Sequence, residues 1–250
     1  MLLDNRVVLI TGGARGIGAA IARVLAREGA TVAINCVSST AKADALAESI
    51  VESRGKAKAY CADVTDTEAV ARMIEAIHGE YGRIDGVINN AIAGVQAGLL
   101  ENVSWDDYET AYKYGAKAVL NTVNAVRPIM KNQGGGRIVN IVSEQWNFGA
   151  VGWSVYLAGK GAMVGLSRVM ADELGPENIT VNMVSPGWMR TEKVTDDMDL
   201  SDFTSRVPMR RQGDAEEIGK VCAFLMSDLA AFVSGAYIPV SGGTVRQMGG

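Results

Sequence analysis

The stretch Val7-Val-Leu-Ile-Thr-Gly-Gly-Ala-Arg-Gly-Ile-Gly18 joins a short apolar run to a cluster of glycines. Four consecutive aliphatic residues are typical of a buried strand, and the apolar residues that follow, Ile17, Ile21 and Val24, recur at the spacing of a helix. The glycines therefore lie at a turn from a strand into a helix. Such units, repeated along a chain, build a parallel sheet covered by helices.

Three glycines of this turn, Gly12, Gly16 and Gly18, suit a dinucleotide. Glycine permits the tight turn, lets a pyrophosphate approach the backbone and lets the helix pack closely on the sheet. The first helical turn also offers free N–H groups and the positive end of its dipole to phosphates. By itself, the cluster fits an ordinary turn equally well.

The alternation of strand and helix continues along the chain. Helix-length stretches separate most of seven short β-branched runs, which predicts an α/β fold with a doubly wound, seven-stranded parallel sheet and helices on both faces. No linker and no internal repeat interrupts the pattern, so we expect a single domain over 1–250 with one long loop at about 188–213. The predicted strands are 7–10, 31–34, 57–61, 86–89, 137–142, 179–184 and 236–240.

Helix starts are marked by sequence signals as well. A hydroxyl or carboxyl residue followed three positions later by an acid is the pattern of a capping box. We expect long helices over about 104–131 and 154–175. The candidate boxes are Thr65 with Glu68, Ser104 with Asp107, and Asp214 with Glu217.

Composition and charge exclude several classes of protein. The chain of 250 residues is 48% hydrophobic and carries a net charge of −4, so it has ample core and no general attraction to nucleic acid or anionic membranes. No run of about 18 apolar residues could span a bilayer, and no signal peptide precedes the first strand. Cys36, Cys61 and Cys222 are odd in number and far apart, which indicates reduced, buried thiols. We expect a cytoplasmic protein.

The end of the second predicted strand bears on the choice of dinucleotide. NAD-binding chains usually carry an acid there for the ribose 2′-hydroxyl. This chain has Asn35-Cys-Val-Ser-Ser39, with no acid, and the hydroxyls of Ser38 and Ser39 together with Arg15 could accept a 2′-phosphate. The sequence therefore favours NADP(H), with NAD(H) possible.

A tyrosine and a lysine are spaced to share one face of a helix. Tyr156 and Lys160, at positions i and i+4, would project side by side. Alone, such a pair is typical of a helix surface. Ser143, which follows the fifth predicted strand, adds a hydroxyl at the sheet edge where the other motifs also end.

Taken together, these residues resemble the short-chain dehydrogenase/reductase family over essentially the whole chain. Ser143 precedes Tyr156 by the thirteen positions typical of the family. The order and spacing of the motifs are far more specific than any one of them. The matching motifs are Thr11-Gly12-x-x-x-Gly16-x-Gly18, Asp63-Val64, Asn89-Asn90-Ala91, Ser143, Tyr156-x-x-x-Lys160 and Pro186-Gly187.

The resemblance implies a Rossmann fold and a role for each matching position. Tyr156 would be the proton donor and acceptor, Lys160 would hold the nicotinamide ribose and stabilise tyrosinate, and Ser143 would orient the substrate carbonyl. Asp63 would bond the adenine amino group, and Asn89 would contact the adenosine ribose or brace the sheet. The other residues expected at the cofactor are Gly12, Arg15, Gly16, Ile17, Gly18, Asn35, Ser38, Ser39, Val64, Ala91, Pro186, Gly187, Met189 and Thr191.

Elementary chemistry agrees with this division of labour. A free phenol has a pKa of about 10, and an ammonium nearby in a water-poor site favours the anion. Hydride transfer to a ketone places negative charge on its oxygen, which the hydroxyls of Ser143 and Tyr156 can meet with hydrogen bonds. We therefore expect reduction of a ketone to a secondary alcohol.

Three positions depart from the family pattern. Ile92 stands where glycine is usual and adds bulk near the nicotinamide, and Ser241 stands where aspartate is common. The helix asparagine that relays protons in many members is replaced by Gly115, or by Tyr112 in another register. These departures leave open a second class: a catalytically weak member that binds NADP(H) as a partner subunit or sensor.

The substrate is less constrained. Within the family, the chain most resembles 3-oxoacyl-carrier-protein reductases, and Arg127, Lys131, Arg210 and Arg211 could meet an acidic carrier. Asp172, Glu173 and Glu177 oppose that docking, which leaves a free ketone or alcohol as the alternative to an acyl thioester. The residues expected at the substrate pocket are Ile92, Gln145, Trp146, Trp153 and Trp188, although the tryptophans could equally pack against the loop or a neighbouring subunit.

The sequence also bears on how the chain assembles and on whether it binds a metal. The resemblance implies a homotetramer, with a dimer as the next choice, built through the two long helices and the last strand. The loop at 188–213 would order over the substrate as a lid. No cluster of His, Cys and carboxylates has metal-ligand spacing, so we expect no catalytic metal.

Overall fold

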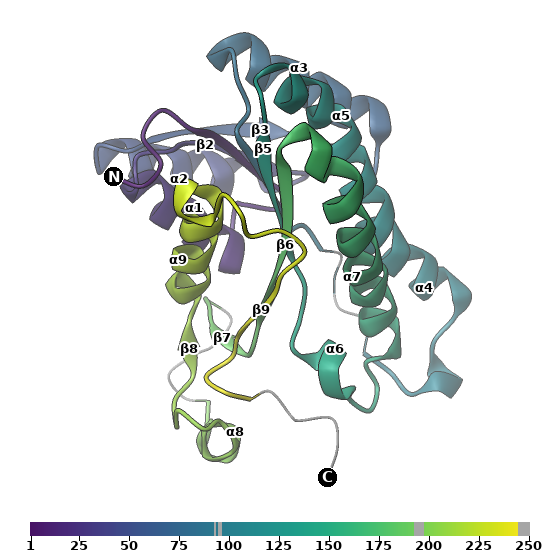
Figure 1. Ribbon diagram of the computed structural model, residues 1–250. Helices are drawn as coiled ribbons and strands as arrows, with labels where there is room; N and C mark the ends of the chain where they lie inside the picture. The colour runs from purple at the N-terminus through teal and green to yellow at the C-terminus, as the bar shows by residue number, and fades with distance from the viewer. Residues whose placement is uncertain (93, 95–96, 193–197, 245–250) are drawn as a thin grey trace.

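The computed structural model describes residues 1–92, 94, 97–192 and 198–244 and contains the seven-stranded parallel sheet that the sequence predicts. Its strand order, β3-β2-β1-β4-β5-β6-β9, reverses direction next to β1, as in a doubly wound sheet. Figure 1 shows the sheet between helices that lie on both of its sides. The strands are β1 (Val7–Ile10), β2 (Thr31–Cys36), β3 (Lys56–Cys61), β4 (Gly86–Asn89), β5 (Gly136–Ile141), β6 (Ile179–Pro186) and β9 (Tyr237–Val240).

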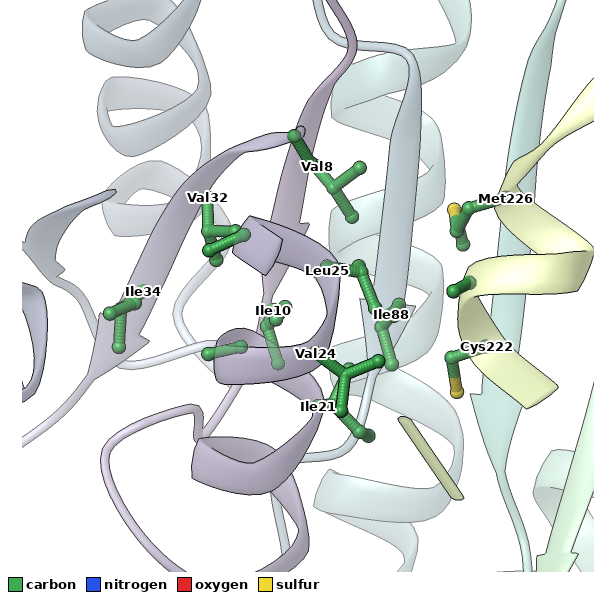
Figure 2. Packing of buried hydrophobic residues seen from close by; sticks show 14 of the residues in the cluster. Val8, Ile10, Ile21, Val24, Leu25, Val32, Ile34, Ile88, Cys222 and Met226 are labelled. Carbon is green, nitrogen blue, oxygen red and sulfur yellow. The ribbon is translucent and has the colours of Figure 1, made fainter. Parts of the chain in front are cut away.

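Helices cover both faces of this sheet, because side chains alternate between the faces along each strand. Val8 and Ile10 of β1 pack with α1, α2 and α9, whereas Val7 and Leu9 pack with α3, α5 and α7. Figure 2 shows the first of these layers, in which Val8 and Ile10 lie with side chains of α1 and α9. The helices are α1 (Gly16–Arg27), α2 (Thr40–Glu52), α3 (Thr67–Tyr81), α5 (Ala118–Asn132), α7 (Ser154–Leu174) and α9 (Ala215–Met226).

The first long helix expected over 104–131 is interrupted. It consists of α4 (Trp105–Tyr112), a π-helical turn (Lys113–Lys117) and α5. Gly115 in this turn packs on the backbone of α7 so closely that a Cβ would lie 2.0 Å from the carbonyl oxygen of Gly159. This close approach of two backbones requires glycine at both positions.

Two of the three expected capping boxes are present, at Ser104 with Asp107 and at Asp214 with Glu217. The third prediction, a capping box at Thr65 with Glu68, is wrong. The Asp66 carboxylate caps α3 by accepting the N–H groups of Glu68 and Ala69, because a carboxylate at that position is an effective cap. Thr65 instead donates its N–H and its hydroxyl to Asp63, each at 2.8 Å.

The prediction of three buried cysteines is also partly wrong. Cys36 and Cys222 are buried, but Cys61 is exposed. Cys61 is the last residue of β3, and β3 is the edge strand of the sheet formed by the described residues, where the packing is less complete.

The expected lid begins and ends in a second, small sheet. β7 (Met189–Arg190) pairs with β8 (Gly213–Asp214), and α8 (Ser201–Arg206) lies between them. Residues 193–197 of this segment lie outside the described residues. In the part of the chain that the structure covers, no helix is long and apolar enough to cross a membrane.

Candidate active site

The predicted catalytic residues meet at the carboxyl edge of the sheet. Ser143 follows β5, and Tyr156 and Lys160 lie in the first turns of α7, which begins beside that strand. Ser143 and Tyr156 are hydrogen-bonded through their side chains. Lys160 is 6% exposed, donates to the carbonyl of Ile141 at 2.6 Å and places its ammonium 5.9 Å from the centre of the Tyr156 ring. A hydroxyl, a phenol and an ammonium thus share one small, largely buried space.

Burial dominates the pKa values of this group. It lowers the pKa of Lys160 from 10.5 to about 8, because a buried ammonium loses its hydration. It raises the pKa of Tyr156 above that of a free phenol, and the hydrogen bond from Ser143 opposes this only in part. The expectation that Lys160 lowers the pKa of Tyr156 is therefore not met in this structure. The reason is that desolvation of the phenol outweighs the favourable interactions of its anion.

A cavity of about 130 Å³ lies beside Tyr156 and Lys160, between α4 and α7. Ile92, predicted for the substrate pocket, lines it, and so do Tyr114 and Gly115. The sequence left two candidates, Gly115 and Tyr112, for the position of the usual helix asparagine. Because Gly115 lines the same cavity as Lys160, it is the candidate that lies at the site. Tyr112 is instead exposed, with its ring 6.2 Å from that of Trp105. Tyr114 has no sequence motif that could have identified it.

The glycine turn has the geometry that a bound phosphate needs. Gly12 and Gly16 have φ angles of +60° and +56°, and a Cβ on Gly18 would lie 2.6 Å from the carbonyl oxygen of Gly12. The N–H of Gly16, at the start of α1, donates to both carboxylate oxygens of Glu192 at 3.1 and 3.2 Å. This helix start therefore binds an oxyanion, as the sequence argument expects for a phosphate. Ile17, the next residue, packs against the core.

The residues expected around the adenosine divide into accessible and structural groups. Arg15 and Ser38 are exposed and Ser39 is half-buried, so a ligand can reach them. Asn35 is 1% exposed, and its side chain accepts from the N–H of Gly12 and donates to the carbonyl of Ala62. Its amide therefore holds the glycine turn against the end of β3.

The next two positions of this half of the site are Asp63 and Val64. Asp63 is half-buried, and one of its carboxylate oxygens accepts both hydrogen bonds from Thr65. The Val64 side chain is fully buried in the core with α3. The structure thus gives Val64 a packing role, and Asp63 retains an accessible carboxylate.

The end of β4 is fixed by buried hydrogen bonds. Asn89 donates to Asn140 at 2.8 Å and accepts from Thr122 at 2.7 Å, so of its two expected roles the structure shows the brace. Asn90 donates to the carbonyls of Thr11 and Gly12, and the Thr11 hydroxyl accepts the N–H groups of Asn90 and Ala91. These contacts lock the ends of β1 and β4 together. Thr11 and Asn90 both belong to motifs that the sequence shows, but only the structure shows that the two residues are in contact.

The expected substrate residues do not form one pocket. Trp153 lies edge-on to Tyr156, with ring centres 5.6 Å apart, and Trp146 packs on Gly161 with 42% of its surface exposed. The N–H of Gln145 donates to the Ser143 hydroxyl at 3.3 Å. These three residues therefore surround the catalytic group on the side of α6 (Gln145–Phe148).

Trp188 belongs to a separate cavity of about 440 Å³. Its ring lies edge-on to Phe203 of α8, 4.7 Å between centres. The cavity is also lined by Gly187 and Met189, two of the residues expected at the nicotinamide, and by Ser241. Pro186 ends β6 at the same edge, and Thr191 follows β7. The base of the lid thus encloses its own space, next to the carboxyl end of β9.

Two further residues hold the backbone of Ser143 through a chain of hydrogen bonds. The hydroxyl of Tyr237, on β9, donates to the Ser143 carbonyl at 3.1 Å, and Ser185 lies 2.7 Å from the same hydroxyl. Glu144, 2% exposed, lies beside them. Tyr237 is more than ninety positions away in sequence, so no local pattern could have linked it to this site.

The cations proposed for carrier docking are mostly paired. Arg127 and Lys131 contact Glu177 at 2.8 and 3.0 Å and lower the pKa of its carboxyl to about 2. Arg211 forms two hydrogen bonds with Glu217. Arg127, Lys131 and Arg211 therefore offer less free positive charge than the sequence suggests.

Comparison with known proteins agrees with this architecture. A family model described as enoyl-(acyl carrier protein) reductase matches residues 12–245. The chain is 36% identical to a 3-oxoacyl-(acyl-carrier-protein) reductase of Thermotoga maritima, with 98% of this chain and 100% of the relative covered.

Solved structures are also similar to this chain over nearly its whole length. A short-chain dehydrogenase/reductase from Serratia marcescens has a TM-score of 0.91 at 33% identity, covering 98% of this chain and 100% of that one. An NAD⁺-bound xylitol dehydrogenase has a TM-score of 0.90 at 30% identity, covering 97% and 100%. This chain therefore belongs to the short-chain dehydrogenase/reductase family of oxidoreductases.

Proposed function

We propose that this chain is an NADP(H)-dependent reductase that converts a ketone to a secondary alcohol, with Tyr156 as the proton donor. The observation that carries the proposal is that the buried Ser143 hydroxyl, the half-buried Tyr156 phenol and the buried Lys160 ammonium lie together at the carboxyl edge of the sheet. The bound dinucleotide would supply the hydride. The protein would position the ketone and stabilise the charge that develops on its oxygen.

Two of the three side chains would act on the substrate oxygen, and the third would act on Tyr156. Ser143 and Tyr156 would donate hydrogen bonds to the carbonyl, and the phenol would transfer its proton as the alkoxide forms. Burial raises the pKa of Tyr156 further above neutrality, so the phenol carries its proton at neutral pH and can serve as an acid. Lys160 would stabilise the resulting tyrosinate, which its charged form attracts.

The glycine turn and the end of β2 support the choice of cofactor. The start of α1 accepts an oxyanion at the N–H of Gly16, which fits a pyrophosphate. Cys36 ends β2 where NAD-binding chains usually carry an acid, and Arg15 and Ser38 are exposed nearby. These features favour NADP(H), and NAD(H) is the alternative.

For the substrate, we propose a free or thioester-linked 3-oxo compound. The relatives named as carrier-protein reductases favour the thioester. The pairing of Arg127 and Lys131 with Glu177 disfavours an acidic carrier as the physiological partner. We also propose a cytoplasmic homotetramer of single-domain subunits, each with a lid over about 188–213.

The test is NADPH oxidation with free ketones, 3-oxoacyl thioesters of small thiols, and the same acyl groups on a carrier protein. Tyr156→Phe should lower kcat by roughly 10²- to 10⁴-fold with little change in NADPH affinity. Tyr60→Phe is the matched control, because it removes a hydroxyl that contacts Glu80 and Tyr81 rather than the catalytic group. NADPH binding without turnover of any ketone would instead identify the alternative function, a cofactor-binding subunit or sensor.

A further inference from the structure

Two cysteines end neighbouring strands of the sheet. Cys36 is the last residue of β2 and Cys61 the last residue of β3, and their Cα atoms are direct partners in the parallel register. Neighbouring strands lie about 4.8 Å apart. Disulfides join Cα atoms roughly 4.4–6.8 Å apart, so the backbone spacing is suitable for a bond between these residues.

The two side chains also lie on the same face of the sheet. Cys36 packs in the core with Ile34 of its own strand, and Ala59 of β3 packs against the same core. Since side chains two positions apart share a face, Cys61 follows Ala59 onto that face. The Cys61 thiol donates to the carbonyl of Val37 at 3.1 Å, which brings its sulfur across to the end of β2.

The two thiols also affect each other electrostatically. The pKa of Cys36 is raised by burial first, and then by its interaction and hydrogen bond with Cys61. The exposures differ as well: Cys36 is 4% exposed, whereas Cys61 is open to solvent. An oxidant from solution would therefore reach Cys61 first and find Cys36 beside it.

We propose that Cys36 and Cys61 form a thiol-oxidation site at which a peroxide produces an intramolecular disulfide. The Cys61 sulfur attacks hydrogen peroxide, which breaks the O–O bond, forms a sulfenic acid and releases one water. The Cys36 sulfur then attacks the sulfenic sulfur, and the hydroxyl leaves as a second water. In total, two thiols are oxidised by two electrons, and one peroxide is reduced to two waters.

The new bond would change the end of the sheet where the cofactor is proposed to bind. Cys61 must leave the carbonyl of Val37, which begins the turn to Ser38 and Ser39. This consequence rests on the proposed function, because it assumes that the turn holds the 2′-phosphate. Because the turn loses the hydrogen bond that holds the Val37 carbonyl, we expect the oxidised protein to bind NADPH roughly threefold to tenfold more weakly.

The experiment treats the full-length reduced protein with hydrogen peroxide and maps tryptic peptides under non-reducing conditions. We expect peptides 28–42 and 59–72 to be joined in monomeric chains, and the link to disappear with dithiothreitol. Cys222→Ser is the matched control and should still form the link, because Cys222 is fully buried in α9. Cys36→Ser should instead leave a sulfenic acid on Cys61 that dimedone traps.

The inference is overturned if Cys61 of the wild-type chain passes to the sulfinic acid without a linked peptide, or if the link appears only between chains. Peptide mapping needs no cofactor, so it is independent of the proposed function. Titration of the reduced protein with NADPH tests the cofactor assignment, and titration of the linked protein tests the consequence. Equal NADPH affinity of the two forms would refute control of the cofactor site by this bond.

Discussion

Replacing Lys160 by methionine should remove a pH dependence of stability that the buried ammonium creates. The pKa of Lys160 falls from 10.5 to about 8 on folding because of burial. The folded protein therefore binds fewer protons than the unfolded chain between these two pH values. The free energy of unfolding rises with pH across this range, and the gain is lost as the pH falls back to about 8. At about 1.4 kcal/mol for each pKa unit, the charged form costs roughly 3 kcal/mol.

The assay is chemical denaturation of wild type and Lys160→Met, without cofactor, at about pH 7 and about pH 10. Between these conditions the free energy of unfolding of the wild type should rise by about 2 to 3 kcal/mol more than that of the variant. Other titrating groups are common to both proteins and cancel in the comparison. Parallel pH profiles would refute the conclusion that Lys160 is buried as an ammonium with a lowered pKa.

Three further predictions concern the backbone contact and the cofactor turn. Gly115→Ala should lower the free energy of unfolding by roughly 1–3 kcal/mol, because its Cβ has no room against α7. Gly79→Ala, on an open face of α3, should raise it by up to about 1 kcal/mol in the same denaturation assay, and equal effects would contradict the close contact. Glu192→Gln should tighten NADPH binding roughly twofold to fivefold in a titration, most strongly at low salt, because the carboxylate competes for the Gly16 N–H. Ser38→Asp should reduce the preference for NADPH over NADH by about tenfold or more, and unchanged kcat/KM ratios would argue against a 2′-phosphate there.

The sequence predicted the sheet well because its strands depend on local patterns, and the proposed catalytic residues come together through patterns of the same kind. The β-branched runs at 7–10 and 86–89 are buried on both faces, and such runs have few alternatives to a central parallel strand. Tyr156 and Lys160 share a face of α7 through helical spacing alone. The glycine turn is likewise local, since its positive φ angles are properties of Gly12 and Gly16 themselves.

Contacts between distant segments could not be predicted in this way. The sequence left Asn89 with two roles, and only the structure shows the bonds to Asn140 and Thr122 by which it braces the sheet. It placed Trp188 with the substrate, whereas the lid carries this ring into a separate cavity with Phe203. In each case the outcome depends on which side chains the fold brings within reach.

By itself, then, the order of residues determined the strands, the helices and the groups that we propose to react, because backbone geometry and side-chain periodicity act over a few positions. Only the tertiary structure decided their electrostatics. Burial of Lys160 against Ile141 lowers the pKa of the ammonium, and burial raises the pKa of Tyr156. Desolvation depends on everything that surrounds a charge, and those surroundings come from β5, α4 and α7 together.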